Sequence, residues 1–280
     1  MHSEPHGVFL AETSDINRSL TQSLFVNEQF LIDHAAQLND NPEVLTSDHF
    51  SSNPYRRQFN WALGKLGDER SVLESFLFRS TFVFVHSAYD VYTEKLYSFV
   101  RTAQELDRQG GNESQLSATF SSLGTSAEAE LPPEALLTLD YLRWRRNRLV
   151  HNDGSPSQQL SSLIKNHGAR LDEFWSDTLN GLPSLSFTDL STTDFTQDET
   201  IDLIRVFRRL ADQVDEAVLA KLGTTALLDF LRREFIAHHG AKLNGWDRER
   251  QLRKFRGYAL TRLKLEVPPQ QIEEIDFSGV

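Results

Sequence analysis

Apolar residues recur along most of the chain at steps of three and four, the spacing that places them on one face of an α-helix. The most regular example begins near residue 71 and continues for about 35 residues. Its apolar positions are Phe78, Phe82, Val85, Tyr89, Tyr92, Leu96 and Phe99. No clear series of the alternating positions typical of strands appears. The pattern therefore predicts an all-α fold with this segment as its central helix.

Two helices are expected before the central helix. The first runs over residues 14–40 and begins with a Ser14-Asp15 cap, and the second, shorter helix starts at Asn53. The central helix itself is expected to start at Ser71, because Ser71 and Glu74 have the spacing of a capping box.

After the central helix, residues 108–133 are rich in Ser and Gly and predict an irregular insert with one short helix. Pro133 then starts a helix that the Asn152-Asp153-Gly154 turn ends. Residues 157–182 are expected to be helical in part. A long amphipathic helix over 196–222 is expected to end at Gly223, and two more helices precede Pro268-Pro269.

These elements predict a helical bundle built from three segments. Residues 1–70 form an N-terminal helical segment that packs on the core. Residues 71–223 form the bundle domain, and residues 224–280 form a basic helical segment with an acidic tail.

Composition narrows the class of protein. With 39% hydrophobic and 25% charged residues, the chain has the balance of a globular domain. It has no cysteine, which excludes disulfides, thiolate metal sites and cysteine nucleophiles, and favours a reducing compartment. We find neither a signal-peptide pattern nor an apolar run of membrane-spanning length, so we expect a cytoplasmic protein without a membrane partner.

Charge is unevenly distributed along the chain. Residues 224–264 contain ten Lys and Arg against four acids, a net charge of +6, although the whole chain carries −11. The overall charge opposes binding of a polyanion. The asymmetry between segments, however, indicates contact with nucleic acid or self-association.

The stretch WRRNRLVHNDG, residues 144–154, combines arginines with a histidine. On a helix at 100° per residue, Arg146 falls in the middle of an apolar stripe. A buried guanidinium cannot lose its proton, so Arg146 requires a carboxylate, a phosphate or a water-filled cleft. The predicted stripe consists of Leu139, Leu142, Leu149 and Val150. The flanking arginines, expected to be ordinary charge, are Arg143, Arg145 and Arg148.

His151 lies about 140° around the helix from Arg146, so the two side chains do not stack. They converge if the helix frays at His151, or if another helix or a second chain completes the site. His86, Asp90 and Glu94 follow at i, i+4 and i+8 on the central helix and offer a carboxylate to Arg146 or His151. A solvated helix face also explains Asp90 and Glu94, and capping of a helix C-terminus also explains His151.

Arginine and histidine suit phosphodiester cleavage without a metal. Histidine transfers a proton to or from a ribose oxygen, and arginine stabilises the added negative charge on the phosphate. Only RNA supplies an internal 2′-OH nucleophile, so this chemistry favours RNA over DNA. No metal-site, P-loop or dinucleotide motif appears, and we expect neither a metal nor a cofactor.

The run RNRLVHN, residues 146–152, resembles the signature of the HEPN superfamily: Arg, four to six residues, then His, commonly with Asn after the Arg. The likeness covers residues 71–223. It implies a helical bundle that forms a homodimer and brings two Arg/His sets into one cleft. Many members are metal-independent endoribonucleases of toxin–antitoxin and antiphage systems, and others are non-catalytic scaffolds.

We therefore expect an endoribonuclease acting as a toxin or antiphage effector, with an antitoxin or regulatory protein as a possible partner. His151 is expected to act as general acid/base and Arg146 to bind the scissile phosphate. Asn147 positions the phosphate or the histidine, and Asp90 or Glu94 orients the pair. The residues expected to contact RNA are Arg143, Arg148, Arg250, Arg253, Lys254 and Arg256.

Two alternatives stay open. Arg232 or Arg233 followed by His238 also fits the Arg/His spacing, which makes His238 or His239 the working histidine. In the second alternative, the chain is a non-catalytic helical interaction or regulatory protein. In that case Arg146 forms a buried ion pair, and the basic segment docks on the acidic remainder or on another protein.

Overall fold

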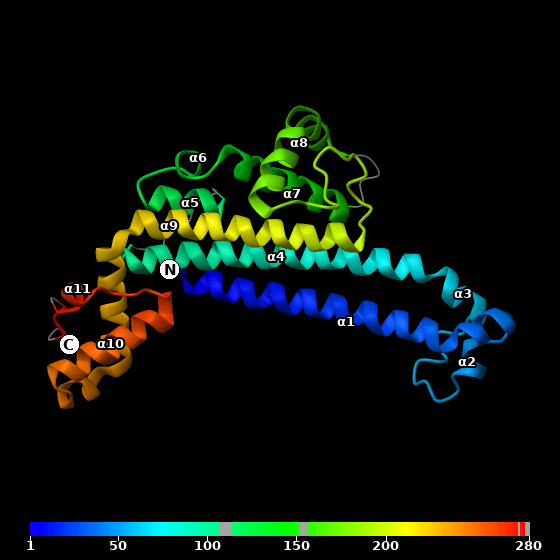
Figure 1. The fold of residues 1–280 in the computed structure, drawn as a ribbon, viewed down its shortest axis with the longest axis horizontal. Helices are drawn as coiled ribbons and strands as arrows, with labels where there is room; N and C mark the ends of the chain where they lie inside the picture. The colour runs from blue at the N-terminus through cyan, green and yellow to red at the C-terminus, as the bar shows by residue number, and fades with distance from the viewer. Residues whose placement is uncertain (107–113, 152–155, 274, 278–280) are drawn as a thin grey trace.

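The computed structural model describes residues 1–106, 114–151, 156–273 and 275–277 of the chain. Within these residues every regular element is a helix, so the predicted all-α class is confirmed. The elements are α1 (Glu4–Asp40), α2 (Thr46–His49), α3 (Leu63–Asp68), α4 (Arg70–Ala103), α5 (Gln115–Ser122), α6 (Ala127–Glu130), α7 (Pro133–His151), α8 (Gln158–Leu179), α9 (Gln197–His239), the 3-10 helix η1 (Gly240–Gly245), α10 (Arg248–Leu263) and α11 (Pro269–Glu273), as Figure 1 shows.

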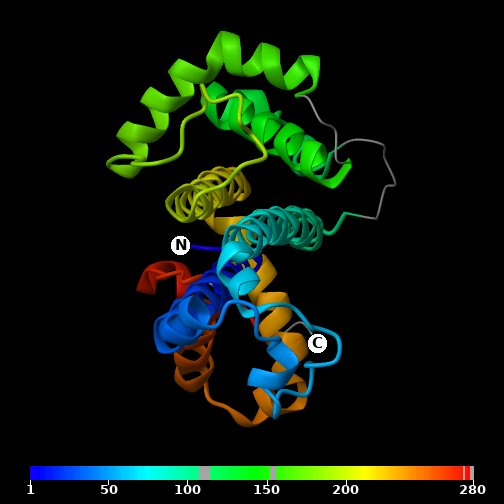
Figure 2. The same ribbon diagram turned by 90° about the vertical axis from the view of Figure 1, so that its right-hand side faces the viewer.

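Three long helices form the centre of the molecule: α1, α4 and the first part of α9 run side by side (Figure 1). The pair α7–α8 lies on one side of this layer. Helix α10 lies on the other side, and the end-on view of Figure 2 shows the same separation. One buried cluster extends from Phe9 to Phe277, so all three predicted segments contribute to a common core.

The predicted apolar face of the central helix is confirmed, since all seven of its positions are buried in α4. Phe82 and Tyr89 face Phe207 of α9, with ring centroids 6.2 and 5.6 Å apart. Tyr92 faces Phe9 of α1 at 5.4 Å. Burial of these aromatic side chains joins α4 to both neighbouring helices.

The predicted start of the first helix at Ser14 is wrong. Helix α1 begins at Glu4, because the Ser3 hydroxyl accepts a hydrogen bond from the backbone N–H of His6 at 3.3 Å and thereby caps the helix. Ser14 lies within the helix and donates to the carbonyl of Leu10 at 2.8 Å. A serine bonded in this way does not interrupt a helix that has already formed.

The segment between α1 and α4 is less helical than predicted. Asn53 accepts a hydrogen bond from the backbone N–H of Tyr55 at 2.8 Å, which closes a turn where a helix start was expected. Helix α3 then leads directly into α4 through Glu69, whose φ of −79° and ψ of −2° lie near the helical region. Ser71 therefore lies inside α4 and does not cap it.

The middle of the chain follows the predicted order more closely. The insert before Pro133 contains two short helices, α5 and α6, where one was expected. Helix α7 begins at Pro133 as predicted. The Asn152-Asp153-Gly154 turn expected to end it lies outside the described residues.

Gly223 bends the long C-terminal helix but does not end it as predicted. Its φ of 70° and ψ of 160° are non-helical, and the helix resumes at once and continues to His239. Glycine adopts this positive φ without the steric penalty that a Cβ would bring. The kink turns the chain across the end of α4, where Phe230 packs on Phe99, and towards α10 (Figure 1). The predicted segment boundary therefore coincides with a bend inside α9.

A substitution at Gly168 of α8 tests how closely this helix packs on the loop before α9. A Cβ at Gly168 would lie 2.6 Å from the carbonyl oxygen of Phe187, a backbone atom that has little room to move. We expect Gly168→Ala to lower the free energy of unfolding by about 1–3 kcal/mol. Chemical denaturation measures this change.

Gly257 of α10 supplies the matched control, because a Cβ there has no heavy atom within 4 Å. Gly257→Ala should raise the free energy of unfolding by about 0.5–1 kcal/mol through helix propensity. Equal effects of the two substitutions would contradict the close approach of α8 to Phe187.

Candidate functional site

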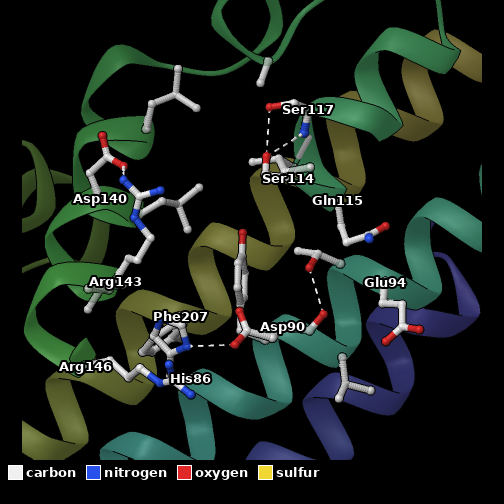
Figure 3. A pocket seen from close by; sticks show the side chains of 18 of the residues that line it. His86, Asp90, Glu94, Ser114, Gln115, Ser117, Asp140, Arg143, Arg146 and Phe207 are labelled. Carbon is white, nitrogen blue, oxygen red and sulfur yellow. Dashed lines mark hydrogen bonds and ion pairs between the residues drawn. The ribbon is translucent and has the colours of Figure 1, made fainter. Parts of the chain in front are cut away.

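A cavity of about 750 Å³ lies between α4, α5, α7 and α9 (Figure 3). Five residues that the sequence predicted for the site line it: Asp90, Glu94, Arg143, Arg146 and Asn147. His86 and Tyr89 of α4 and Phe207 of α9 line it as well. The structure thus brings the arginine of the predicted motif close to the polar stripe of the central helix.

The face of α7 that packs on the core differs from the predicted stripe. The buried residues of α7 are Ala135, Thr138, Tyr141, Leu142 and Arg145. Of the four stripe positions only Leu142 is fully buried, and Val150 is 50% exposed. Leu139 and Leu149 are partly buried and pack against the core. The predicted stripe is therefore confirmed in part, and the buried face is turned away from it because two polar residues, Thr138 and Arg145, occupy core positions. Thr138 accepts a hydrogen bond from the indole N–H of Trp175 at 2.7 Å.

Arg145, predicted to be ordinary surface charge, is the buried arginine of α7, with 1% of its surface exposed. Its guanidinium donates to Glu199 Oε1 at 2.6 Å and to the Thr192 carbonyl at 2.8 Å. It also donates to the Tyr141 hydroxyl at 3.2 Å and lies 4.2 Å from the Phe195 ring centroid. These contacts satisfy a charge that would otherwise be costly to bury.

Arg146, by contrast, is half-buried and faces the cavity (Figure 3). Its only hydrogen bond within the described residues is a long one, 3.5 Å, to Asn147 Oδ1. Its Nε is buried and has no hydrogen-bond partner, and no described carboxylate forms an ion pair with it. The expected pairing with Asp90 or Glu94 is therefore not present, and the guanidinium is available to an anion.

The carboxylate of Asp90 instead contacts His86, one helical turn earlier. His86 Nδ1 and Asp90 Oδ2 lie 3.2 Å apart, and the imidazole is mostly buried against Phe207 at a centroid distance of 5.7 Å. If Nδ1 carries the proton and donates it to Asp90, Nε2 keeps its lone pair. His86 and Arg146 line the same cavity (Figure 3), which therefore contains a histidine that the sequence reasoning did not select.

Tyr89 adds a second buried polar group without a partner. Its hydroxyl makes no hydrogen bond within the described part of the chain, and burial raises the pKa of Tyr89, which keeps the phenol neutral. Glu94 is exposed at the rim. Buried donors are usually satisfied by a partner, so Tyr89 and Arg146 leave this cavity able to bind a ligand with acceptor atoms.

His151, the predicted acid/base, does not line the cavity. It is the last residue of α7 and is exposed to solvent. This placement agrees with its angular separation from Arg146 of about 140°. Within one chain, the structure therefore separates the arginine and the histidine of the motif.

The two arginines predicted to bind RNA from α7 already have protein partners. Arg143 is exposed, forms an ion pair with Asp140 at 2.8 Å and lies over the Trp144 ring. Arg148 donates to the Leu190 carbonyl at 3.2 Å and to the Thr192 hydroxyl, and so holds the loop before α9. Arg148 is therefore better explained as a structural residue than as an RNA contact.

The remaining predicted RNA contacts are exposed on α10: Arg250, Arg253, Lys254 and Arg256. The guanidinium of Arg250 lies 5.2 Å from the ring centroid of Trp246. Helix α10 lies on the opposite side of the central layer from α7 and α8 (Figures 1 and 2). The basic helix and the cavity therefore do not form one continuous surface on a single face.

The residues of the second Arg/His pattern, in the C-terminal part of the chain, form packing and structural contacts. Arg232 donates to the Asp276 carbonyl, and Arg233 forms an ion pair with Glu105 at 2.9 Å. His239 packs on Phe235 at 4.6 Å, and burial lowers the pKa of this histidine. With both arginines engaged, this match offers no free guanidinium comparable to that of Arg146.

No protein family, curated protein or solved structure matches the chain. Within the described part of the chain, no helix has both the length and the apolar composition needed to cross a lipid bilayer.

Arg145 and Arg146 are neighbours with opposite surroundings, which gives a direct test of the helix rotation. Arg145→Met leaves Glu199 without its buried partner, and we expect it to lower the free energy of unfolding by about 3–5 kcal/mol. Arg146→Met removes no ion pair and should change the same quantity by less than about 1 kcal/mol. Chemical denaturation of both variants measures the difference. A larger loss of unfolding free energy for Arg146→Met than for Arg145→Met would support the predicted apolar stripe, with Arg146 as the buried arginine.

Proposed function

We propose that this chain is a metal-independent endoribonuclease of the HEPN type, in which Arg146 binds the scissile phosphate within the cavity. The observation that carries the proposal is the unpaired guanidinium of Arg146 beside the His86–Asp90 pair. An arginine without a carboxylate partner, facing an open cavity, suits a phosphate that arrives with the substrate. Asn147 adds an amide at the same edge.

The reaction follows from the chemistry of these groups. A base removes the proton from the ribose 2′-OH, whose oxygen attacks the adjacent phosphorus, and the 5′-oxygen of the next nucleotide leaves with a proton from an acid. The pentacoordinate phosphorane carries additional negative charge on its non-bridging oxygens. Arg146 stabilises that charge through charge-assisted hydrogen bonds, and the half-buried setting strengthens them.

Two histidines are candidates for the proton transfer. His86 lies in the same cavity as Arg146, and Asp90 is placed to orient its ring and to favour the imidazolium that forms during the reaction. His151 is the histidine that the resemblance implies, and it reaches an Arg146 site only from a second copy of the chain. The two assignments predict different behaviour in mixed dimers.

The cellular role that we propose is that of a toxin or antiphage effector held in check by an antitoxin or regulatory partner. It rests on the HEPN resemblance of residues 146–152. The exposed basic residues of α10 support contact with an RNA backbone outside the cavity, at a strength that falls with salt.

Cleavage of a labelled RNA in the presence of EDTA tests the activity. We expect Arg146→Ala to lower the cleavage rate by about a hundredfold to a thousandfold, because it removes the charge that stabilises the phosphorane. Loss of the acid/base histidine should lower the rate by about a hundredfold to ten-thousandfold. His86→Ala and His151→Ala, measured in parallel, identify which histidine that is.

His167→Ala on α8 is the matched control, since it removes a half-buried histidine that lines no part of the cavity. Its cleavage rate should equal that of the wild type, and circular dichroism confirms that each variant is folded. Cleavage unaffected by Arg146→Ala would refute the proposed site. A folded wild type that cleaves no RNA would favour the non-catalytic interaction protein.

Mixing two inactive variants tests whether the site is shared between subunits. If Arg146 of one protomer works with His151 of another, Arg146→Ala mixed with His151→Ala restores complete sites in the mixed dimers. Random pairing then recovers roughly a quarter of wild-type activity. If His86 of the same chain is the working histidine, Arg146→Ala mixed with His86→Ala recovers none.

Light scattering reports the oligomeric state of the wild type and of each mixture. Recovery in the pair with His86→Ala would contradict a site formed within one chain. A wild type that stays monomeric at assay concentration and still cleaves RNA would exclude His151 as the partner of Arg146.

A further inference from the structure

The first turn of α1 packs on α9 through a cluster that shares no residue with the cavity. His6 and Asp215 are buried, and His2, whose side chain is 44% exposed, completes the cluster. The two imidazole rings stack with centroids 4.5 Å apart. One potential ligand atom from each of the three residues lies within 4.8 Å of the others.

Hydrogen bonding determines which nitrogen of His6 is free. His6 Nε2 lies 2.7 Å from Asp212 Oδ1, so the ring donates its Nε2–H to this carboxylate. In the neutral ring the lone pair is then on Nδ1, which is buried and has no hydrogen-bond partner among the described residues. A histidine that donates one N–H to a carboxylate and presents its other nitrogen is typical of metal ligands.

His2 presents a similar atom. Its Nδ1 is buried and has no hydrogen-bond partner in the described part of the chain, and it lies 3.7 Å from Asp215 Oδ2, beyond hydrogen-bonding distance. Two donor atoms of a tetrahedral zinc site lie about 3.4 Å apart when each is about 2.05 Å from the metal. The separation between His2 Nδ1 and Asp215 Oδ2 is therefore close to that of two metal ligands. The His2 ring, which stacks on His6 with an interplanar angle of 14°, would turn to direct its lone pair at the same ion.

Asp215 is a buried carboxylate whose hydrogen bonds come from neutral donors. The backbone N–H of Ser3 donates to Oδ2 at 2.9 Å, and the Ser3 hydroxyl donates to Oδ1. Each carboxylate oxygen has a further lone pair, so these bonds leave Oδ2 able to bind a cation. Burial raises the pKa of Asp215, and the two histidines are the basic groups closest to its charge. Buried carboxylates usually pair with a cation or coordinate a metal.

We propose that His2 Nδ1, His6 Nδ1 and Asp215 Oδ2 form a structural site for a divalent transition-metal ion, zinc first among them. Two imidazole nitrogens and one carboxylate oxygen are a ligand set that zinc prefers, and a water molecule on the exposed side of His2 completes four-coordination. Asp212 orients His6 and raises its basicity. The ion would tie the start of α1 to the middle of α9.

Zinc binding to the full-length chain, prepared without a polyhistidine tag, tests the site. Isothermal titration calorimetry should show one zinc ion per wild-type chain. His6→Gln keeps an amide N–H that can bond Asp212 but removes the Nδ1 ligand, and we expect it to weaken binding by about a hundredfold or more. His167→Ala, the matched control from α8, should bind zinc as the wild type does.

Cobalt substitution and thermal unfolding give independent readouts. Cobalt should produce the visible absorption of a four-coordinate site with nitrogen and oxygen ligands, since the chain has no cysteine. Saturating zinc should raise the Tm of the wild type by about 5 °C and leave His6→Gln unchanged. His2→Ala, at a half-exposed position, decides the matter if His6→Gln does not fold.

Equal zinc affinity of the wild type, His6→Gln and His2→Ala would overturn the proposal and leave the cluster as a packing contact between histidine and aspartate. None of these measurements uses RNA. Arg146→Ala should bind zinc normally, whereas His2→Ala should retain RNA cleavage at temperatures where it is folded. Failure of either proposal is therefore recognised without reference to the other.

Discussion

The ion pair between Arg145 and Glu199 decides how α7 is rotated against α9. A guanidinium with 1% of its surface exposed requires a carboxylate, and Glu199 supplies one at 2.6 Å from the first turn of α9. With Arg145 held towards the core, the next side chain, Arg146, is turned by about 100° and faces the cavity. The candidate site thus depends on a structural interaction of the residue beside it.

The comparison of α4 and α7 shows how far the sequence allows prediction. The core face of α4 is mainly apolar, and the periodicity of its apolar residues was sufficient to identify it, although Thr81, His86, Thr93 and Arg101 of the same helix are also buried. The core face of α7 includes Thr138 and Arg145, whose polar groups are satisfied by Trp175 and Glu199, far along the chain. Helical periodicity of apolar residues does not detect such pairings. The nearness of His86 to Arg146 was hidden for the same reason, although its i, i+4 relation to Asp90 was visible.

The central layer separates the two features that the sequence associated with RNA. The cavity lies between this layer and α7, whereas the exposed basic residues lie on α10 at the opposite side (Figures 1 and 2). The kink at Gly223 produces this arrangement, because it turns the second part of α9 across the end of α4 towards α10. A strand of RNA would reach both features only around the edge of the layer or through a second copy of the chain. The charge asymmetry of the sequence is therefore real, but it does not locate the cavity.

Buried polar atoms without partners distinguish the chemistry of the two proposed sites. In the cavity these atoms, Arg146 Nε and the Tyr89 hydroxyl, carry hydrogens, and a buried donor is satisfied by the acceptor oxygens of an anion. Beside α9 the buried atoms are Nδ1 of His2 and Nδ1 of His6. In the neutral His6 ring, which donates its Nε2–H to Asp212, Nδ1 carries a lone pair. A lone pair beside the buried Asp215 carboxylate is satisfied by a cation. The same requirement, that buried polar groups find partners, thus points to a phosphate at one site and to a metal ion at the other.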